Sequence, residues 1–199
     1  QLTGDLTPDY SALSAETFEQ IRSEFARRGV SVRALLLMRD PVDRCLSAIR
    51  MYRGRSRIAH RIPILPTDSS GEALERVYAT RAFELLTRYD RTLCNLETVF
   101  EDAEILTGFY EDLFTAEAVR QIEAFCGLDP MKPDFARTVN VSRFKDEAVA
   151  EDVLARVARH YRPVYEFAAT RYGRDAMASR WKGYRYLCYR RAESLICRA

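Results

Sequence analysis

Arg39 and Ser47 are the two residues of this sequence whose types and spacing best suit the binding of a phosphate. Arg39 follows a run of five apolar residues, ALLLM, and Ser47 stands eight residues later, after an Asp-Pro step. A guanidinium can hold a phosphate through two hydrogen bonds, and a helix N-terminus favours anions. Arg44 precedes Ser47 by three residues and shares its helical face. In an alternative interpretation, Arg39 pairs with Asp40 or Asp43 and Ser47 is a small packing residue.

The elements that must position these residues are predicted to alternate between strands and helices. Two largely apolar runs, Val30–Met38 and Ala103–Tyr110, are typical of buried parallel strands. Capping residues and helical spacing predict helices over 14–29, 40–52, 74–99, 115–127 and 146–172, the last broken near Pro163. Residues 53–71 show no clear periodicity and are expected to form a loop. This order predicts an α/β fold, in which ligands bind at the carboxyl ends of the strands.

The composition indicates one domain over residues 1–199, because 199 residues that are 47% hydrophobic can bury one sizeable core. A net charge of +2 argues against binding of nucleic acid through the overall charge of the protein. Five cysteines without a CxxC pair or metal-ligand spacing suit free thiols, so we expect a reducing, cytoplasmic compartment and no metal. No apolar run approaches the roughly 18–20 residues of a membrane span.

Several stretches resemble sulfotransferases that use 3′-phosphoadenosine-5′-phosphosulfate (PAPS), in the carbohydrate/heparan-type or bacterial branch. The stretch LLLMRDPVDRCLSAI is similar to the segment that binds the 3′-phosphate, which implies that Arg39 and Ser47 hold this group. The stretch FYEDLFTAEAVRQIEAFCGLD resembles the Y-E-D-L strand end and the helix after it, which implies that Tyr110 lies near the adenine. The stretch VNVSRFKDE falls where the family has a loop that reaches the nucleotide. It implies contacts to the adenosine phosphate from Ser142, Arg143 and Lys145.

The resemblance extends over nearly the whole chain and implies a fold and an activity. TGDLTPDYS is similar to the G-E-K-[ST]-P-x-Y segment of the carbohydrate-type branch, and HYRPVYEFAATRYG resembles the closing helix of bacterial members. The implied fold is a three-layer, P-loop-NTPase-like parallel sheet flanked by helices. The implied reaction moves a sulfuryl group from PAPS to an acceptor hydroxyl, with a carbohydrate as the expected acceptor, and leaves PAP, the 3′,5′-bisphosphate, without needing a metal.

Two departures from the family pattern leave an alternative open. No segment matches the loop K-x-G-T-T-x-L that holds the 5′-phosphosulfate, and the only lysines are Lys132, Lys145 and Lys182. We therefore expect a further strand and phosphate loop upstream of Gln1. The alternative is a catalytically degenerate module of the same fold that binds PAP. Leu6 stands where the carbohydrate-type segment has lysine, which leaves the acceptor open. A nucleotide kinase would need a G-x-x-x-x-G-K-[ST] loop, which the sequence lacks.

Two residues are candidates for the general base that sulfuryl transfer to a hydroxyl requires. Asp5 lies in the TGDLTP segment, where some relatives use a glutamate, although Asp5 can instead cap the turn at Thr7. His60 lies in a basic loop with Arg53, Arg55, Arg57 and Arg61. This loop suits an anionic acceptor such as a sulfated sugar. The alternative for the loop is a solvated surface.

Overall fold

The computed structural model describes residues 2–53, 62–65, 67–136 and 147–188. The chain forms two compact units, a first unit from residues 1–39 and 89–139 and a second unit from residues 40–88 and 140–199. The chain passes from the first unit to the second directly after Arg39. The expectation of a single domain over 1–199 stays a prediction, and each unit is described by itself.

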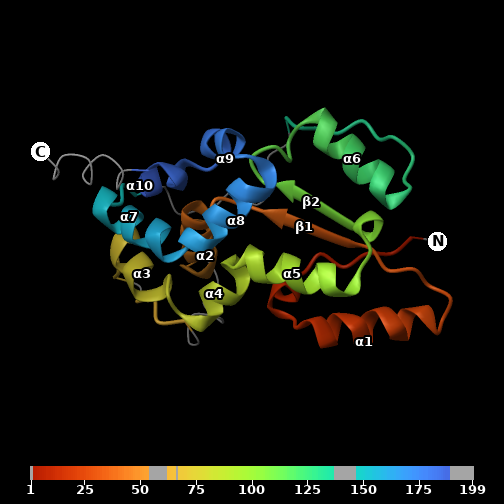
Figure 1. The fold of residues 1–199 in the computed structure, drawn as a ribbon. Coiled ribbons are helices and arrows are strands. Elements are labelled where there is room, and N and C mark those ends of the chain that lie inside the picture. The colour runs from red at the N-terminus through yellow and green to blue at the C-terminus, as the bar shows by residue number, and fades with distance from the viewer. Residues whose placement is uncertain (1, 54–61, 66, 137–146, 189–199) are drawn as a thin grey trace, which may run out of the picture. The chain divides into compact units, whose positions relative to one another are not determined.

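The first unit contains two parallel strands, β1 (Ala34–Met38) and β2 (Ile105–Phe109). They pair in register from Ala34 opposite Ile105 to Met38 opposite Phe109, and their arrows point the same way in Figure 1. Both strands lie inside the ranges predicted from the sequence and are shorter at their N-terminal ends. The mixed α/β class is therefore confirmed. The three-layer, P-loop-like arrangement stays a prediction, because the described sheet has two strands.

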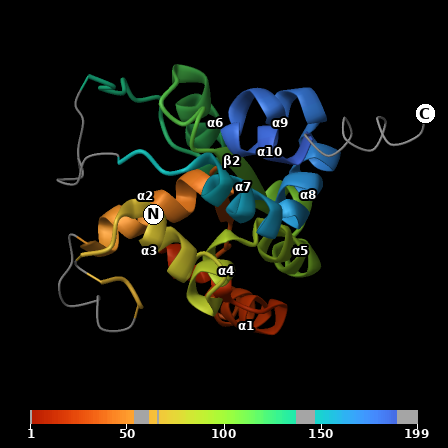
Figure 2. The ribbon, with the colours of Figure 1, turned by 90° about the vertical axis from the view of Figure 1, so that its left-hand side faces the viewer.

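Helices cover the strand pair of the first unit. Figures 1 and 2 show α5 (Tyr89–Val99) and α6 (Ala116–Cys126) on opposite sides of the strands. The unit also contains η1 (Pro8–Ala12), α1 (Ala15–Ala26) and η3 (Asp102–Glu104). Both helices begin where their predicted ranges, 14–29 and 115–127, begin. Ser14 Oγ caps α1 by accepting from Thr17 N at 3.3 Å, and Thr115 Oγ1 caps α6 by accepting from Ala118 N at 3.2 Å.

Arg22 fastens α1 to the segment between α5 and β2. One guanidinium nitrogen donates to the carbonyl oxygen of Val99 at 2.7 Å, and another lies 3.0 Å from the Glu104 carboxylate. The Arg22 guanidinium also lies over the Phe100 ring, and the rings of Phe18 and Phe100 meet edge to face with centroids 6.3 Å apart. A buried ring contact and a hydrogen-bonded arginine together hold α1 against the strand layer.

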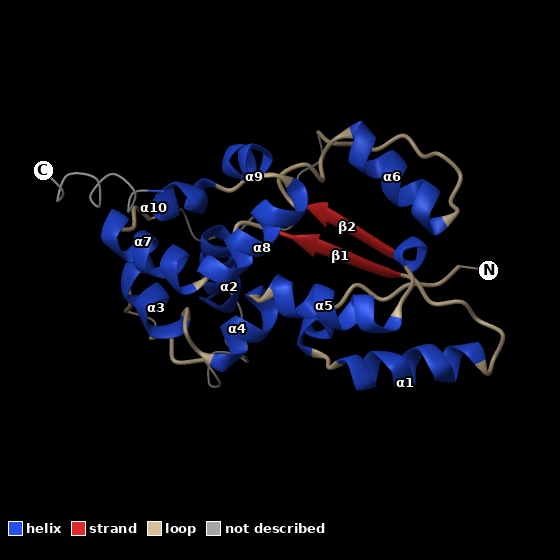
Figure 3. Ribbon diagram, viewed as in Figure 1, coloured by secondary structure: helices blue, strands red, loops and turns tan. Residues whose placement is uncertain are grey.

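The described part of the second unit is helical, and Figure 3 shows no strand in it. Its elements are α2 (Pro41–Arg53), α3 (Ser70–Val77), α4 (Arg81–Thr87), α7 (Glu151–His160), α8 (Arg162–Tyr172), α9 (Arg174–Arg180), η4 (Lys182–Tyr184) and α10 (Arg185–Cys188). Helices α2, α3 and α7 pack on one another, as Figure 2 shows. Their common core contains the fully buried side chains of Ile49, Leu74 and Val157.

The helical pattern over 74–99 is divided among three helices, α3, α4 and α5, so the expectation of one helical stretch is wrong. The first break lies at Tyr78, whose carbonyl oxygen accepts a 2.5 Å hydrogen bond from the Tyr161 hydroxyl instead of an amide one turn later. The second lies at Arg88, which has a non-helical φ of −79° and ψ of 65°. The break near Pro163 is confirmed, because α7 ends at His160 and Pro163 lies in the first turn of α8.

Candidate functional site

Arg39 and Tyr110 meet at the carboxyl ends of the two parallel strands of the first unit. Arg39 directly follows β1 and Tyr110 directly follows β2. The guanidinium carbon of Arg39 lies 4.2 Å from the centroid of the Tyr110 ring. The amide of Tyr110 donates to the carbonyl oxygen of Met38 at 2.7 Å, which continues the strand ladder by one bond and fixes the position of the ring. The structure therefore brings these two predicted residues together.

One buried N–H of Arg39, on its Nε atom, lacks an acceptor at this strand end among the residues that the structure describes. A buried N–H without an acceptor destabilises the folded protein. A ligand oxygen that accepts from this N–H therefore contributes more binding free energy than one that accepts from an N–H already bonded to water. The ring of Tyr110 covers one face of the guanidinium and leaves its edge for hydrogen bonds.

Helix α2 begins at Pro41 as the sequence predicts, with Asp40 as its cap. Asp40 Oδ1 accepts from the amide of Val42 at 2.9 Å, and the Asp40 carbonyl accepts from the amide of Arg44 at 2.7 Å. Ser47 lies in the middle of this helix and is half-buried. Arg44, one turn before Ser47, has its guanidinium carbon 5.5 Å from the Phe83 ring centroid. Arg44 Nη1 is buried without a hydrogen-bond partner in the described part of the chain.

Asp40 is a buried carboxylate that the sequence pattern indicates only as an alternative partner of Arg39 and as the first residue of a predicted helix. It is 1% exposed and also accepts from the Tyr165 hydroxyl at 2.7 Å and from the Gly183 amide at 2.6 Å. Burial raises the pKa of this carboxyl above its ordinary value, while the bonds from Gly183, Tyr165 and Val42 lower it in part. No local signal marks Tyr165 or Gly183 as its partners, because they lie 125 and 143 residues further along the chain.

Cys45 lies in the core of the second unit. It is fully buried, and desolvation raises the pKa of its thiol to about 11 although the neighbouring Arg44 guanidinium lowers it. The hydroxyl groups of Tyr161 and Thr87 lie beside the thiol and also lower its pKa. Burial likewise raises the pKa of Tyr161 far above its ordinary value. Cys45 is therefore a packing residue rather than a nucleophile.

Asp5 forms hydrogen bonds that favour its role as a cap. Its carboxylate accepts from the Thr7 hydroxyl at 2.7 Å and from the Tyr10 hydroxyl at 2.8 Å. These two bonds lower the pKa of the exposed carboxyl, Thr7 more than Tyr10. A carboxylate whose charged form is stabilised in this way is a weak proton acceptor. The geometry favours the turn cap over the general base.

Arg53 is part of the packing of the second unit and not of an exposed basic surface. Its side chain is 9% exposed. It donates to Ser70 Oγ at 3.2 Å and to the carbonyl oxygen of Asp68. Arg53 thus holds the start of α3 against the end of α2. The expectation that Arg53 faces an anionic acceptor is therefore wrong. The other three, Arg55, Arg57 and Arg61, lie outside the described residues.

The predicted site residues do not all lie in one unit of the described structure. His60, Ser142, Arg143 and Lys145 lie outside the described residues. Arg39 and Tyr110 belong to the first unit, whereas Arg44 and Ser47 belong to the second. The binding of one phosphate by both Arg39 and Ser47 therefore stays a prediction.

Comparisons of this chain with protein-family models, with curated proteins and with solved structures found no match. Within residues 2–53, 62–65, 67–136 and 147–188, no group of three or more His, Cys, Asp or Glu side chains is arranged to hold a metal ion. None of the described helices is both long and apolar enough to cross a membrane.

Proposed function

We propose that this chain is a PAPS-dependent sulfotransferase that transfers a sulfuryl group to an acceptor hydroxyl, with a carbohydrate as the expected acceptor. The observation that carries the proposal is the stacking of Arg39 on Tyr110, 4.2 Å apart, at the carboxyl ends of β1 and β2. Ligands of parallel α/β sheets bind at this edge. The two residues are also the ones to which the sequence resemblance assigns the 3′-phosphate and the adenine.

The chemistry of the strand end fits the anionic nucleotide PAPS. The buried Nε of Arg39, which has no acceptor among the described residues, can donate to a phosphate oxygen. The sequence resemblance assigns Ser47 as a hydroxyl donor to the 3′-phosphate, and the half-buried Arg44 lies one turn before Ser47 on the same helix. PAPS itself supplies the activated sulfuryl group. The residues of this chain bind and orient the nucleotide, which is the larger part of what group transfer requires.

The direct test is incubation of the protein with ³⁵S-labelled PAPS and a panel of glycans, lipids and phenols. Transfer of label to one acceptor class, together with formation of PAP, is the expected result. No transfer to any acceptor, combined with firm PAP binding, would point to the degenerate PAP-binding module instead. Neither transfer nor PAP binding would overturn both assignments.

A simpler measurement precedes the activity assay. PAP at about 100 times its dissociation constant should stabilise the folded protein by roughly 2.7 kcal/mol. The resulting rise in the unfolding temperature can be compared with that caused by adenosine 5′-phosphate, which lacks the 3′-phosphate. A rise with PAP alone supports a pocket for the 3′-phosphate, and an absence of any rise argues against it.

A further inference from the structure

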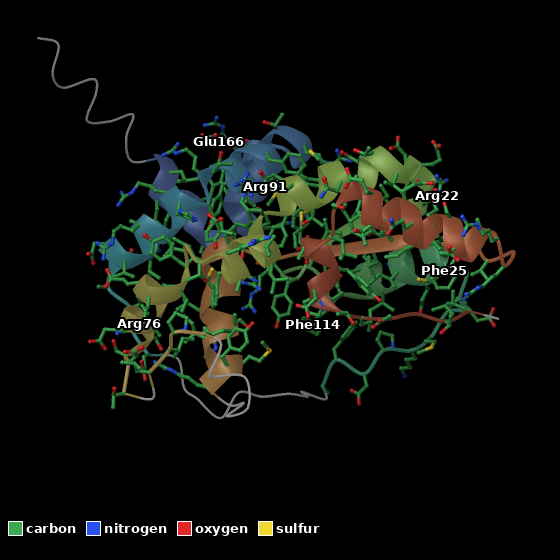
Figure 4. All side chains as sticks on the ribbon, turned by 90° about the horizontal axis from the view of Figure 1, so that it is seen from below. Arg22, Phe25, Arg76, Arg91, Phe114 and Glu166 are labelled. Atoms are coloured by element: carbon green, nitrogen blue, oxygen red, sulfur yellow. The ribbon has the colours of Figure 1, made fainter. Side chains whose placement is uncertain are left out.

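Tyr110 and Phe114 expose two aromatic rings at the carboxyl end of β2 in the first unit. Tyr110 is 41% exposed and Phe114 is 61% exposed. Their ring centroids lie 5.6 Å apart, and the ring planes meet at 87°. Figure 4 labels Phe114, which lies well away from Phe25, another exposed phenylalanine of this unit. The sequence interpretation did not assign a role to Phe114.

The backbone between the two rings is held in a fixed turn. The amide of Asp112 donates to the carbonyl oxygen of Phe109 at 3.1 Å, and the amide of Leu113 donates to that of Tyr110 at 3.2 Å. The Thr115 hydroxyl closes the turn by donating to the Asp112 carbonyl at 2.8 Å. Thr115 also caps α6, so the turn is anchored at both ends. An aromatic surface on such a support costs little conformational entropy when a ligand binds.

A cation adjoins this aromatic surface. The Arg39 guanidinium stacks on Tyr110, and its Nε lacks an acceptor in the described part of the chain. Phe114 contacts the same Tyr110 ring against which the guanidinium lies. This combination matches a ligand that has both a planar ring and a negative charge. A nucleotide has both, because its base can stack on an aromatic side chain while its phosphate bonds the arginine.

We propose that Phe114, together with Tyr110, forms the surface against which the base of the bound nucleotide packs. This inference rests on the proposed function and adds a specificity-determining residue to it. The sequence resemblance names Tyr110 alone, whereas the geometry adds Phe114, whose ring is the more exposed of the two. The contact selects a nucleotide over an abasic sugar bisphosphate, because only the base presents a planar ring.

The test compares Phe114→Leu with the wild-type chain in calorimetric titrations with PAP and with an abasic ribose bisphosphate. Phe25→Leu is the matched control, since Phe25 is 39% exposed on α1 of the same unit. We expect Phe114→Leu to weaken PAP binding at least about fivefold, the low end of base stacking on an aromatic ring. Binding of the abasic bisphosphate should not change, and Phe114→Tyr should keep PAP affinity within about twofold.

The outcomes separate this inference from the proposed function. If wild type binds PAP and Phe114→Leu binds it equally well, the inference is overturned and the proposed function stands. If Phe114→Leu weakens PAP and the abasic bisphosphate alike, the ring does not contact the base and the inference is again overturned. If PAP does not bind wild type but adenosine 5′-phosphate binds in a Phe114-dependent way, the proposed function fails and the inference survives. No binding of any nucleotide overturns both.

Discussion

The hydroxyl of Tyr165 donates a 2.7 Å hydrogen bond to the buried carboxylate of Asp40 at the start of α2. The same carboxylate accepts from the amide of Gly183 in η4 at 2.6 Å. Three segments of the second unit, from α2, α8 and η4, therefore meet at one side chain. Beside them, the Tyr165 ring packs edge to face on Trp181, with centroids 5.6 Å apart. Asp40 thus joins the helix that contains Ser47 to the C-terminal part of the described chain.

Removal of the Asp40 carboxylate should destabilise the protein more than removal of any one of its partners. Asp40→Ala leaves the amides of Val42 and Gly183 and the Tyr165 hydroxyl without this acceptor. Each buried donor left unsatisfied costs about 1–3 kcal/mol. Tyr165→Phe removes one donor and leaves the other two bonds, so we expect a loss of only about 1 kcal/mol. Urea unfolding of the two variants measures the difference.

Asp43→Ala is the control for this comparison, because Asp43 lies in the first turn of the same helix and is half-exposed. Its substitution should cost less than about 1 kcal/mol, as expected for a carboxylate near a helix N-terminus. If Asp40→Ala and Asp43→Ala lower the free energy of unfolding equally, the buried carboxylate does not have the structural role argued for it.

Asp40 also predicts a pH dependence of stability. Burial raises the pKa of its carboxyl above the ordinary value of 3.8, so the folded protein holds this proton more firmly than the unfolded chain does. Its contribution to stability is therefore fully present below pH 3.8 and is lost as the pH rises through the folded pKa. Asp40→Asn lacks this titration. The free energy of unfolding of wild type relative to Asp40→Asn should fall as the pH rises above 3.8, and a difference that stays constant contradicts the raised pKa.

Gly183 is predicted to tolerate no side chain. A Cβ atom at this position would lie 2.9 Å from Asp40 Oδ1 and 3.0 Å from Tyr165 Cζ. Gly183→Ala should therefore destabilise the protein by about 1–3 kcal/mol, as overpacking of a buried site does. Gly71→Ala is the matched control, because a Cβ there would lie 3.7 Å from Val149 Cγ1, an ordinary contact, within helix α3. Thermal unfolding should show loss in the first variant and no loss in the second, and equal behaviour would refute the close approach.

The local features of the fold were predictable from the sequence because each depends on neighbouring residues. Ser14 and Thr115 cap their helices, and Gly127 ends α6 with a φ of 67°, which glycine adopts without strain. The breaks in 74–99 were not predictable, since the apolar spacing continues across them. What separates α3 from α4 is a hydrogen bond from Tyr161, a residue 83 positions beyond Tyr78.

The same distinction applies to the candidate site. Arg39 follows an apolar run, so the sequence pattern was sufficient to place it at a strand end. Tyr110 was identified through the resemblance of its segment to a strand end of sulfotransferases. The exposed ring of Phe114 could not be predicted, because its spacing in FYEDLF gives no indication of which apolar residues a turn leaves uncovered. Arg53 shows the opposite error. Its place in an arginine-rich stretch suggested exposure. In the structure its side chain is 9% exposed, and its guanidinium donates to the carbonyl of Asp68 and the hydroxyl of Ser70.

The cysteines should differ sharply in reactivity. Cys45 is fully buried with a thiol pKa of about 11, so near pH 8 only about one thiol in a thousand would be ionised even if a reagent reached it. Cys94 is exposed. We expect iodoacetamide to modify Cys94 in the native protein and to modify Cys45 only after unfolding in urea. Peptide mass spectrometry reports each site separately, and modification of native Cys45 at the rate of Cys94 would contradict its burial.

The sequence resemblance predicts that Arg39 and Ser47 bind the 3′-phosphate and no other part of the nucleotide. A hydrogen bond to a charged group contributes roughly 1.5–3 kcal/mol, so Arg39→Ala should weaken PAP binding at least about tenfold. Ser47→Ala removes a single hydrogen bond to the same charged phosphate, so it should weaken PAP binding by about tenfold. Adenosine 5′-phosphate lacks the 3′-phosphate, so neither substitution should alter its affinity. Arg27→Ala is the control, because the Arg27 side chain, at the C-cap of α1, is 70% exposed and its removal should leave both affinities unchanged.

The double variant Arg39→Ala/Ser47→Ala distinguishes a shared phosphate from two separate effects. If both side chains bond one phosphate, the loss in the double variant is smaller than the sum of the two single losses, since the second substitution removes a contact that the first has already weakened. Additive losses would mean that the two residues act at different places. If the substitutions weaken the binding of PAP and of adenosine 5′-phosphate equally, Arg39 and Ser47 do not bind the 3′-phosphate. The main reason for placing Ser47 in the site would then be lost.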